Sequence, residues 1–472
     1  MYPIDLLPSP GHFVSDILSL VRSLQASRRV TPDAQPSPAD FDVNIVTNTG
    51  FLPPSPLPNL QKPYDIWEDA LAEAQRVLKL GENLPETHTE ERAAGELWRE
   101  RIRSMPVLET DSLLADSQLL RRAHQVVAFL VHFYVHSIPP DTVSESIVVP
   151  RPLVAPLMAV SQALGIAPVV TFADVVLWNW ELVDPELPVN MENMRFGRHL
   201  FSGTEAERNF YHGSARTELV GVEILNIINE YHSLPNVTEI SSIFRINKLL
   251  ERLSLAIEGI NTSIQAMRDE VDPQVFFWEA RPWWNGSASG SFAPAWIYEG
   301  VADSSKLDLC GPSAGQSSVM HALDLFLDID HKLQQRRYPA PSQSNKKADH
   351  GFMERMRRYM PGKHRAYLES IARSPRPLRS VAQETPVVRE YYNAAVGTLK
   401  KLRDLHMRVA CLYVVTMSRG KPPPGCPMAA VMRRMEREAA RQGPVTGTGG
   451  NELSLLLKAG RDATTRAFLT TN

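Results

Sequence analysis

Two long segments of the chain carry apolar side chains at alternating steps of three and four residues, which is the spacing of one face of an α-helix. In the first segment this face is formed by Ile243, Ile246, Leu250, Leu253, Ile257, Ile260, Ile264 and Met267. In the second, which we expect to be helical from Val388 to Met417, it is formed by Val388, Tyr392, Ala395, Leu399, Leu402, His406, Val409 and Tyr413. A long helix with a continuous apolar face is stable when that face is covered. The spacing therefore predicts an all-α protein built on a helical bundle.

The length of the chain predicts two domains, because 472 residues exceed the size at which single hydrophobic cores stop growing. Two proline-rich stretches, SIPPDT and VVPRPLVAPL, interrupt the helical pattern and have the composition of an inter-domain connection. We expect a smaller, mostly helical N-terminal domain over residues 1–149 and a large helical domain over residues 150–472.

The N-terminal residues 1–60 are rich in proline, and GFLPPSPLP mixes rigid prolines with apolar anchors. This composition predicts a strap that lies on a domain surface, with one short helix near Phe13–Ser27. Further helices are expected over residues 64–74, 90–103, 116–137, 214–230 and 352–372. The stretch 183–207 is expected to be irregular, FYHGS at 210–214 to interrupt the helical pattern, and residues 419–450 to form a mobile loop. Only IVTNTG and SIVVP are candidate strands.

Composition and charge narrow the class of protein. The formal net charge of −3 gives no basic field for nucleic acid. The three cysteines, Cys310, Cys411 and Cys426, have no metal-ligand spacing and indicate a reducing compartment. The N-terminus lacks a basic region before an apolar run, and Val126–Val135, interrupted by His132, is too short to cross a bilayer. We expect a cytoplasmic monomer that binds neither membrane nor nucleic acid.

His406 lies on the apolar face of the second long segment, so its imidazole points into the protein. A buried imidazole needs a partner, because an unpaired polar group in a core is costly. It is either a core histidine bonded to a backbone carbonyl or a ligand to a metal or haem. Position alone favours the core histidine.

The stretch FFWEARPWW combines five aromatic residues with Arg281. Its aromatic side chains belong either to a helix end packed in the core or to a flat apolar slot with a guanidinium at its mouth. In the second case Phe276 and Phe277 would contact an aromatic ring, and Arg281 would bind a carboxylate through two hydrogen bonds. That combination suits an aromatic amino acid.

Two stretches of small residues are less specific. GPSAGQSS at 311–318 lacks the lysine of a phosphate-binding loop, and its serines are typical helix N-caps. Small side chains there would also let a flat ligand lie against the backbone. GTGG at 447–450 is either a turn or a loop that closes over a substrate. His132 and His136 have the spacing of two ligands on one helix face, but no acidic third ligand accompanies them.

In chain order, nine segments together resemble the indoleamine 2,3-dioxygenase family, the haem enzymes that open the indole ring of tryptophan. These segments cover most of the chain and read GFLPPSPLP, VVPRPLVAP, TFADVVLWNW, FYHGS, FFWEARP, GPSAGQSSV, MRRYMPGKHR, KKLRDLHMRV and GTGG. One match would be weak, whereas nine in order are specific. The resemblance implies haem b as cofactor, O₂ as co-substrate and a small-molecule substrate, L-tryptophan or a related indoleamine.

The resemblance also implies roles for individual residues. The proximal haem ligand falls on His406, and Arg403 stands where an arginine pairs with a haem propionate. The distal pocket would include Ser214 and Ser313 in supporting roles. The residues implied to contact substrate are Arg281, Phe276, Phe277, Phe172, Val175, Val176, Phe210, Ala314, Gly315 and Thr448.

The chain departs from the family pattern at three positions of the implied pocket. Phe172 replaces a tyrosine, Val175 replaces a cysteine, and Trp284 stands where a smaller apolar residue is common. The implied reaction inserts O₂ across the indole C2–C3 bond and gives N-formylkynurenine, the first step of the kynurenine pathway. Because of the departures, two alternatives stay open: a haem protein of the same fold that acts on a modified indole or senses a gas, and a helical scaffold with a vestigial pocket.

Overall fold

The computed structural model describes residues 37–81, 84, 86–143, 146–287, 294–331, 351–420, 448 and 453–470. The helix expected near Phe13–Ser27 and most of the loop expected over 419–450 lie outside these residues.

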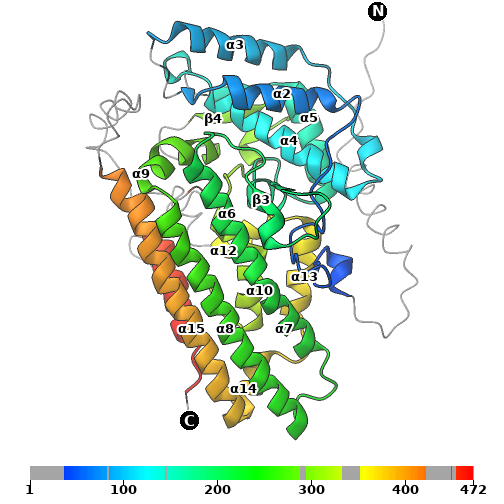
Figure 1. Cartoon of the computed structure of the whole chain (residues 1–472), viewed down its shortest axis with the longest axis vertical. Coiled ribbons are helices and arrows are strands. Elements are labelled where there is room, and N and C mark those ends of the chain that lie inside the picture. Colours follow the sequence, from blue (N-terminus) through cyan, green and yellow to red (C-terminus); the bar gives the residue numbers. More distant parts are fainter. Residues whose placement is uncertain are drawn as a thin grey trace, which may run out of the picture.

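Helices make up most of the described chain, so the all-α expectation is confirmed (Figure 1). The α-helices are α2 (Asp65–Val77), α3 (Thr89–Ser104), α4 (Ser117–His136), α5 (Arg151–Leu164), α6 (Glu205–Val220), α7 (Val222–His232), α8 (Ile240–Glu270), α9 (Pro273–Val275), α10 (Ser318–Phe326), α12 (Phe352–Arg357), α13 (Gly362–Ala372), α14 (Leu378–Glu384), α15 (Pro386–Ala410) and α17 (Leu453–Arg466). The strands are β1 (Ser146–Val149), β2 (Trp180–Leu182), β3 (Met194–Phe196) and β4 (Ala295–Tyr298).

Several short π- and 3₁₀-helical turns lie between these elements. Those that bear on the candidate site are η5 (Ala173–Leu177), η7 (Phe276–Ala280), η8 (Arg281–Trp284), η10 (Ala314–Gln316) and η11 (Cys411–Thr416).

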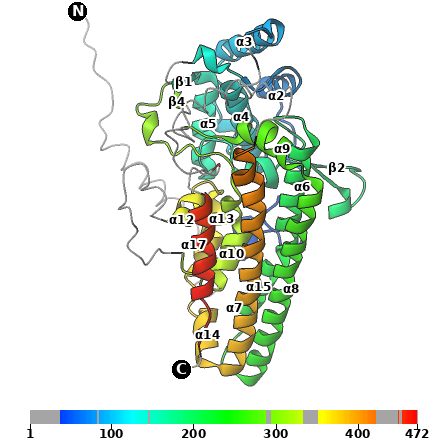
Figure 2. The same ribbon diagram turned by 90° about the vertical axis from the view of Figure 1, so that its left-hand side faces the viewer.

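The two predicted long helices, α8 and α15, pack along each other and form the axis of the bundle (Figure 1). Their apolar faces are buried as expected, for example at Ile246 and Leu253 on α8 and at Tyr392 and Leu399 on α15. The regular part of α15 ends at Ala410, and the chain continues as the π-helical turn η11. α6 packs on α8, and α17 lies along α15 (Figure 2).

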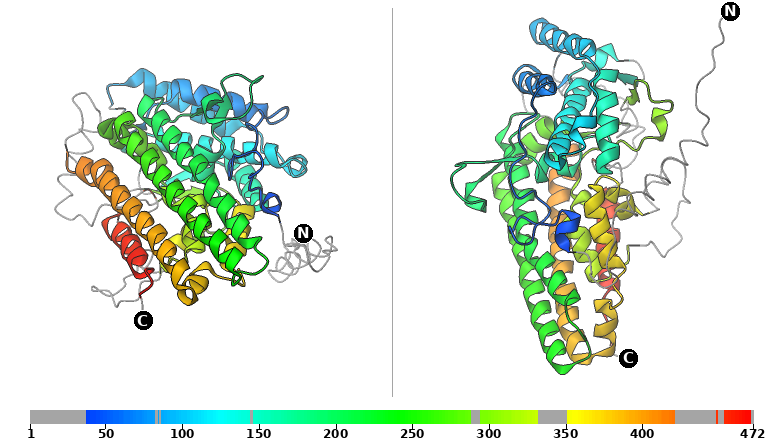
Figure 3. Two further views of the ribbon diagram at one scale, coloured as in Figure 1. Left: turned by 60° about the horizontal axis from the view of Figure 1, so that its bottom comes forward. Right: turned by 90° about the vertical axis from the view of Figure 1, so that its right-hand side faces the viewer.

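The N-terminal helices α2 to α5 pack at one end of this bundle (Figures 1 and 3). The predicted strap is present, because Phe51, Leu52 and Leu57 are almost fully buried. Arg198 fixes the strap by donating a hydrogen bond to the Leu57 carbonyl at 2.8 Å. The buried apolar residues of both regions form one continuous cluster. The division at residue 149 stays a prediction.

The predicted interruption at FYHGS is wrong, since residues 210–214 lie inside α6. The helical segment expected over 214–230 begins earlier and is broken at Gly221, between α6 and α7. A glycine fits at position 213 of α6 because α8 approaches closely there. A Cβ at this position would lie 2.7 Å from Met267 Cε. The glycine therefore marks a tight helix–helix contact.

Other boundaries also differ from those expected. The proline-rich run VVPRPLVAPL forms the end of β1 and the first half of α5, with Pro152 in the first turn where its missing N–H is tolerated. The segment expected as one helix over 352–372 is divided into α12 and α13 by Pro361.

SIVVP contributes the strand β1, as predicted, and pairs in parallel with β4. IVTNTG forms no strand; only a single bridge joins Asn44 and Gly50. The stretch expected to be irregular, residues 183–207, contains β3, which pairs antiparallel with β2 immediately before the stretch. Among the described residues, every helix falls short of the length or the apolar character that a membrane span requires.

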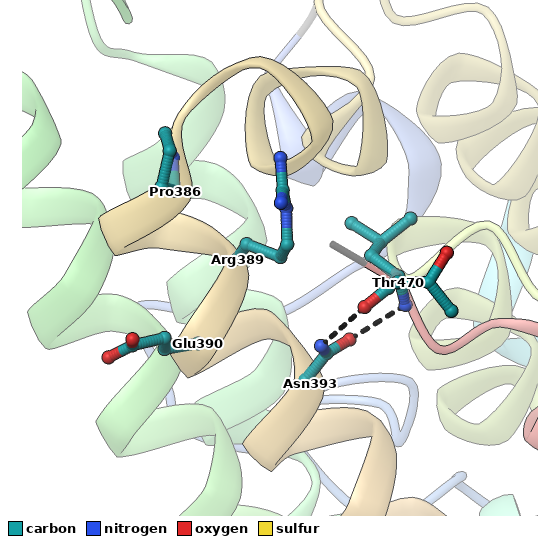
Figure 4. Close-up of a pocket in the computed structure, with 6 residues that line it drawn as sticks. Pro386, Arg389, Glu390, Asn393 and Thr470 are labelled. Atoms are coloured by element: carbon teal, nitrogen blue, oxygen red, sulfur yellow. Dashed lines mark hydrogen bonds between the residues drawn. The ribbon is translucent and has the colours of Figure 1, made fainter. Parts of the chain in front are cut away.

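The last described residues are fixed on the first turns of α15. The Asn393 side chain donates to the Leu469 carbonyl and accepts from the Leu469 N–H, both at 2.9 Å (Figure 4). Thr470, Arg389 and Glu390 line a surface groove beside this contact.

Candidate functional site

The implied site residues come from segments that are far apart in the sequence. His406 and Arg403 lie on α15, and Phe210 and Ser214 on α6. The segment at η5 carries Phe172, Val175 and Val176, and η7 and η8 carry Phe276, Phe277 and Arg281. The turn at η10 carries Ser313, Ala314 and Gly315.

The His406 imidazole is half-buried and makes no hydrogen bond to any described residue. Its burial, and secondly the nearby charge of Arg403, lower the pKa of His406. The ring is therefore neutral at pH 7, which is the form that binds a metal through a ring nitrogen. The core-histidine alternative required a backbone carbonyl as partner, and the described residues supply none.

Arg403, one turn before His406, is held by α10 and α17. Its guanidinium donates to the Asp324 carboxylate and, at 3.0 Å, to the Gly460 carbonyl. His331 contacts the other oxygen of Asp324 at 2.7 Å. Burial by itself would raise the pKa of Asp324, but Arg403 and His331 lower that pKa to about 2. The protein partner of Arg403 is thus a buried carboxylate, which the sequence did not reveal.

An aromatic wall joins α6, η7 and η8. The ring of Phe210 stacks on Trp284 with a centroid distance of 5.2 Å and contacts Phe276 at 4.9 Å. Phe276 also meets the ring of Tyr413, from η11, edge-on at 5.5 Å. The structure therefore brings together Phe210 and Phe276, two of the residues implied to contact substrate, near the end of the helix that carries His406.

The Arg281 guanidinium lies over the ring of Phe277, 5.5 Å from its centroid. Burial lowers the pKa of Arg281 to about 10, so the guanidinium keeps its charge at neutral pH. A charged, half-buried guanidinium beside aromatic rings is suited to bind a carboxylate.

The turn at 311–316 is tied to two other implied segments. The Phe172 N–H donates to Gln316 Oε1 at 2.8 Å, and Gln316 Nε2 donates to the Gly311 carbonyl at 2.9 Å. Thr448 Oγ1 donates to the Pro312 carbonyl at 2.7 Å. These bonds bring Phe172, Thr448 and the small-residue turn into one region.

Within this turn, Ser313 accepts a hydrogen bond from the Gly315 N–H at 3.2 Å, while Ala314 is exposed. Gly315 is required for packing, because a Cβ there would lie 2.8 Å from the ring of Phe352. Ser317 caps α10 as predicted, by accepting from the Met320 N–H.

Ser214 is half-buried on α6 and makes no hydrogen bond to a described residue. One turn later, the fully buried Glu218 accepts a hydrogen bond from Ser317, which joins α6 to the 311–318 segment. Burial raises the pKa of Glu218 to about 7.

With this geometry in place, comparison with known proteins identifies the family. A family model described as indoleamine 2,3-dioxygenase matches residues 37–467. The chain belongs to the indoleamine 2,3-dioxygenase family. The expectation that it is an enzyme, a dioxygenase-type oxidoreductase, is confirmed.

Individual members of the indoleamine 2,3-dioxygenase family match over almost their whole length. An indoleamine 2,3-dioxygenase 1 from Rattus norvegicus is 30% identical over 447 residues, which cover 93% of this chain and 99% of the relative. The corresponding protein from Mus musculus is 29% identical over 455 residues, covering 96% and 99%. A 6-hydroxytryptophan 2,3-dioxygenase from Fusarium equiseti is 27% identical over 427 residues, covering 89% and 95%.

The residues of this family member fit a haem group, the cofactor on which the family depends. His406 supplies a neutral imidazole without a hydrogen-bond partner among the described residues. Arg403, a positive charge one turn away, would face an anionic substituent of the macrocycle. Ser214, Ala314 and Gly315 carry no group that binds iron strongly, so none of the three would compete with His406 for the iron.

Sequence reasoning noted Trp284 only as a departure from the family pattern, whereas the structure makes it part of a buried hydrogen-bonded chain. Trp284 Nε1 donates to Tyr211 Oη, and Tyr211 Oη donates to Glu207 Oε1, both at 2.8 Å. Glu207 also accepts from the N–H groups of Phe201 and Ser202, at 2.8 and 2.7 Å. Because Trp284 lies 73 residues after Tyr211, spacing gave no signal of the contact between them.

The histidines of α4 were also unexplained by the sequence. His132 Nδ1 lies 2.9 Å from the Trp283 carbonyl, and His136 Nε2 lies 2.8 Å from the Asn285 carbonyl. Both rings therefore hold the segment after η7. His124, on the same helix, contacts Asp174 at 2.8 Å. Within the described ranges, no group of three or more histidine, cysteine or acidic residues is placed to hold a metal ion.

Proposed function

We propose that this chain is a haem-dependent dioxygenase that inserts both atoms of O₂ across the indole C2–C3 bond of L-tryptophan, giving N-formylkynurenine. The observation that carries the proposal is the state of His406. Its imidazole is neutral and, in contrast to the hydrogen-bonded rings of His124 and His132, has no hydrogen-bond partner among the described residues. In a chain of this family, that ring would hold haem through one of its nitrogens.

His406 would hold haem through its ring nitrogen, and Arg403 would pair with a propionate. The chemistry that haem supplies when bound is the activation of O₂ for insertion into the indole ring. Asp324 already fixes the orientation of Arg403, so a propionate would be a further acceptor for a guanidinium that is held in place.

Arg281 would bind the carboxylate of the substrate, and Phe210, Phe276 and Phe277 would position the indole ring. The edge-on contact between Phe276 and Tyr413 fixes the first ring, and the guanidinium above Phe277 links the second to the carboxylate site. Such positioning is the main contribution of the protein, because it turns an encounter of separate reactants into a reaction within one complex.

The remaining implied residues would complete the pocket. Phe172, Val175 and Val176 are almost fully buried and would exclude water from the indole. Thr448, which donates to the Pro312 carbonyl, would lie beside the small-residue turn at the edge of the pocket. Ser214 and Ser313 would support the substrate through hydrogen bonds, since the reaction requires no strong general base.

A second candidate substrate is a ring-modified tryptophan, and Trp284 favours it. Its indole is almost fully buried between Phe210 and Phe276 and is hydrogen-bonded to Tyr211, so it gives the pocket wall a shape that a smaller residue would not. The relative from Fusarium equiseti is named for 6-hydroxytryptophan.

The direct test is turnover by the haem-loaded protein in the presence of O₂ and a reductant. We expect the absorbance of N-formylkynurenine to increase with L-tryptophan. Turnover of a hydroxytryptophan without turnover of L-tryptophan would change the assigned substrate but support the assigned reaction class. Failure with every indole, in a protein that retains haem, would overturn the dioxygenase proposal.

A further inference from the structure

His124 is fully buried on α4 and faces an acceptor at each ring nitrogen. Nδ1 lies 2.8 Å from Asp174 Oδ1, and Nε2 lies 3.2 Å from the Ala167 carbonyl oxygen. Both side chains of the pair have zero solvent exposure. A neutral imidazole has one N–H and one lone pair, so it can satisfy only one of two acceptors.

The second oxygen of Asp174 also faces donors. Oδ2 accepts from the Thr171 N–H and from Thr171 Oγ1, both at 2.8 Å. This carboxyl group therefore has the surroundings of a carboxylate. With a proton on each ring nitrogen, His124 donates both to Asp174 Oδ1 and to the Ala167 carbonyl, while the two Thr171 donors satisfy Oδ2. The positive charge of the ring also compensates the buried negative charge of Asp174.

We propose that His124 and Asp174 form a buried imidazolium–carboxylate pair that positions the pocket segment from Phe172 to Val176. Both are positioning residues, because neither is placed against the substrate. The positioning role rests on the proposed function, whereas the charge state of the pair does not.

The pair is connected to the pocket segment through the backbone. Asp174 lies inside η5, and its bonds to Thr171 close the turn in which Phe172 lies. Gln125 Nε2 donates to the Asp174 carbonyl at 2.8 Å. The Phe172 N–H in turn holds Gln316 and so the 311–316 turn. A change at the pair would therefore move two walls of the pocket.

The same network reaches the N-terminal helices. Arg122 donates to Gln125 Oε1 at 2.8 Å, and its charge is matched by Glu68 on α2. The remaining contact of Arg122 is with His199 Nε2 at 2.9 Å. Glu68 compensates the charge of Arg122. Among these groups, His124 is therefore the one that can compensate the charge of Asp174.

His132, two turns further along α4, provides a matched contrast. It is as deeply buried as His124, but among the described residues only its Nδ1 has a partner, the Trp283 carbonyl, while Nε2 has none. Burial, and secondly His136, lower the pKa of His132 to about 3. α4 therefore carries a neutral histidine, His132, whose ring faces one acceptor, and a charged histidine, His124, whose ring faces two.

The charge state is tested by ¹⁵N NMR of the whole protein labelled at histidine, with H124N and H132N used to assign the signals. We expect the His124 ring to carry two protons and the His132 ring one at pH 7. A single proton on the His124 ring would overturn the pair, whether or not the protein turns over an indole.

The positioning role is tested with H124N, D174N, the double variant, and H364N as control. The amide introduced by H124N can still donate to Asp174 but leaves that carboxylate without a cation, so this variant should lower Tm by about 5 °C. It should also raise KM roughly tenfold and change kcat less than about threefold, with the haem content unchanged. D174N is milder, because the amide that it introduces can donate to a neutral His124 and accept from Thr171.

The double variant removes both charges and should reverse most of the KM increase caused by H124N. H364N alters a ring on α13 that is likewise buried and without charge, but that packs against Phe51 of the strap. It should leave KM unchanged even if Tm falls. An unchanged KM in folded H124N, or a double variant worse than the sum of the single variants, would overturn the positioning role. Absence of turnover in the unmodified protein would instead overturn the proposed function and leave the NMR result standing.

Discussion

The pair of long helices and the short turns around the proposed pocket are stabilised in different ways. α8 and α15 are regular, and apolar side chains such as Ile257 and Leu399 fill the contact between them. The turns η5, η7, η8 and η10 span only a few residues each. Side-chain bonds to distant backbone groups fix these turns, as Gln316 does for Phe172.

Because of this difference, we expect the long helices to determine mainly the stability of the fold and the turns to determine mainly substrate binding. Burial of apolar area along α8 and α15 depends little on the identity of each side chain. A turn held by one or two hydrogen bonds loses its conformation when a single partner is removed. We therefore expect changes in the long helices to affect mainly the free energy of unfolding, and changes around the turns to affect mainly KM. His406 is the exception, since it lies on the regular helix and is the proposed haem ligand.

The largest effect is expected for H406A, which removes the proposed axial ligand. The variant should fold but retain no haem, as measured by the loss of the Soret band. H212A is the matched control, because His212 lies two residues before Ser214 and contacts Arg216 at 3.3 Å. It should keep a normal Soret band. A normal Soret band in H406A would contradict the assignment.

In the regular region, I246A should destabilise the fold without changing the site. Ile246 is fully buried on α8, and truncation of such a residue costs about 2–5 kcal/mol of unfolding free energy. Leu255 is 69% exposed on the same helix, so L255A should change stability by less than about 0.5 kcal/mol. Denaturant unfolding measures both. A raised KM for tryptophan in I246A would weaken the separation between the two regions.

In the pocket region, R281A should raise KM or abolish turnover while haem is retained. Loss of a charge-assisted hydrogen bond costs about 1.5–3 kcal/mol, which corresponds to roughly a 10- to 150-fold loss of affinity. R208A is the control, because Arg208 on α6 donates to the Gly197 carbonyl at 2.9 Å and has no proposed contact with substrate. Equal kcat/KM in R281A and the unmodified protein would exclude the carboxylate role.

The smallest effect concerns Asp324, which joins α10 to Arg403. Burial alone would raise the pKa of this carboxyl, but Arg403 and His331 lower it from 3.8 to about 2. A pKa lowered by folding adds stability above the unfolded value, and that stability is lost as the pH falls from about 4 to about 2. The size of the contribution is about 2 kcal/mol. Tm measured against pH should show this loss in the unmodified protein and not in D324N.

The regular region could be predicted from the sequence because its signal is local. The spacing from Ile243 to Met267 and from Val388 to Tyr413 identified both long helices before their partners were known. The strap and β1 were likewise visible in composition. FYHGS was misread because a glycine inside a helix usually weakens it. Here the close approach of Met267 gives Gly213 a packing role that only the folded chain shows.

The pocket region could be predicted only in part. The family resemblance identified the segments, but the contacts that fix them join residues far apart in the chain, such as Arg403 with Asp324 and Tyr211 with Trp284. The strands β2 and β3, of three residues each, are too short to show an alternating pattern. The π-helical turns were not predicted either, since their conformation depends on neighbours rather than on propensity.

The central claim is that α15 supplies the haem ligand while the turns bind an indole amino acid beside it. The most direct test is the absorption spectrum of the reduced, haem-loaded protein with CO, recorded before and after L-tryptophan is added. We predict a Soret band that CO shifts, because His406 is the only protein ligand that we propose, and a further change when L-tryptophan fills the pocket. A protein that binds no haem, or a CO spectrum that does not respond to saturating L-tryptophan, would contradict the account.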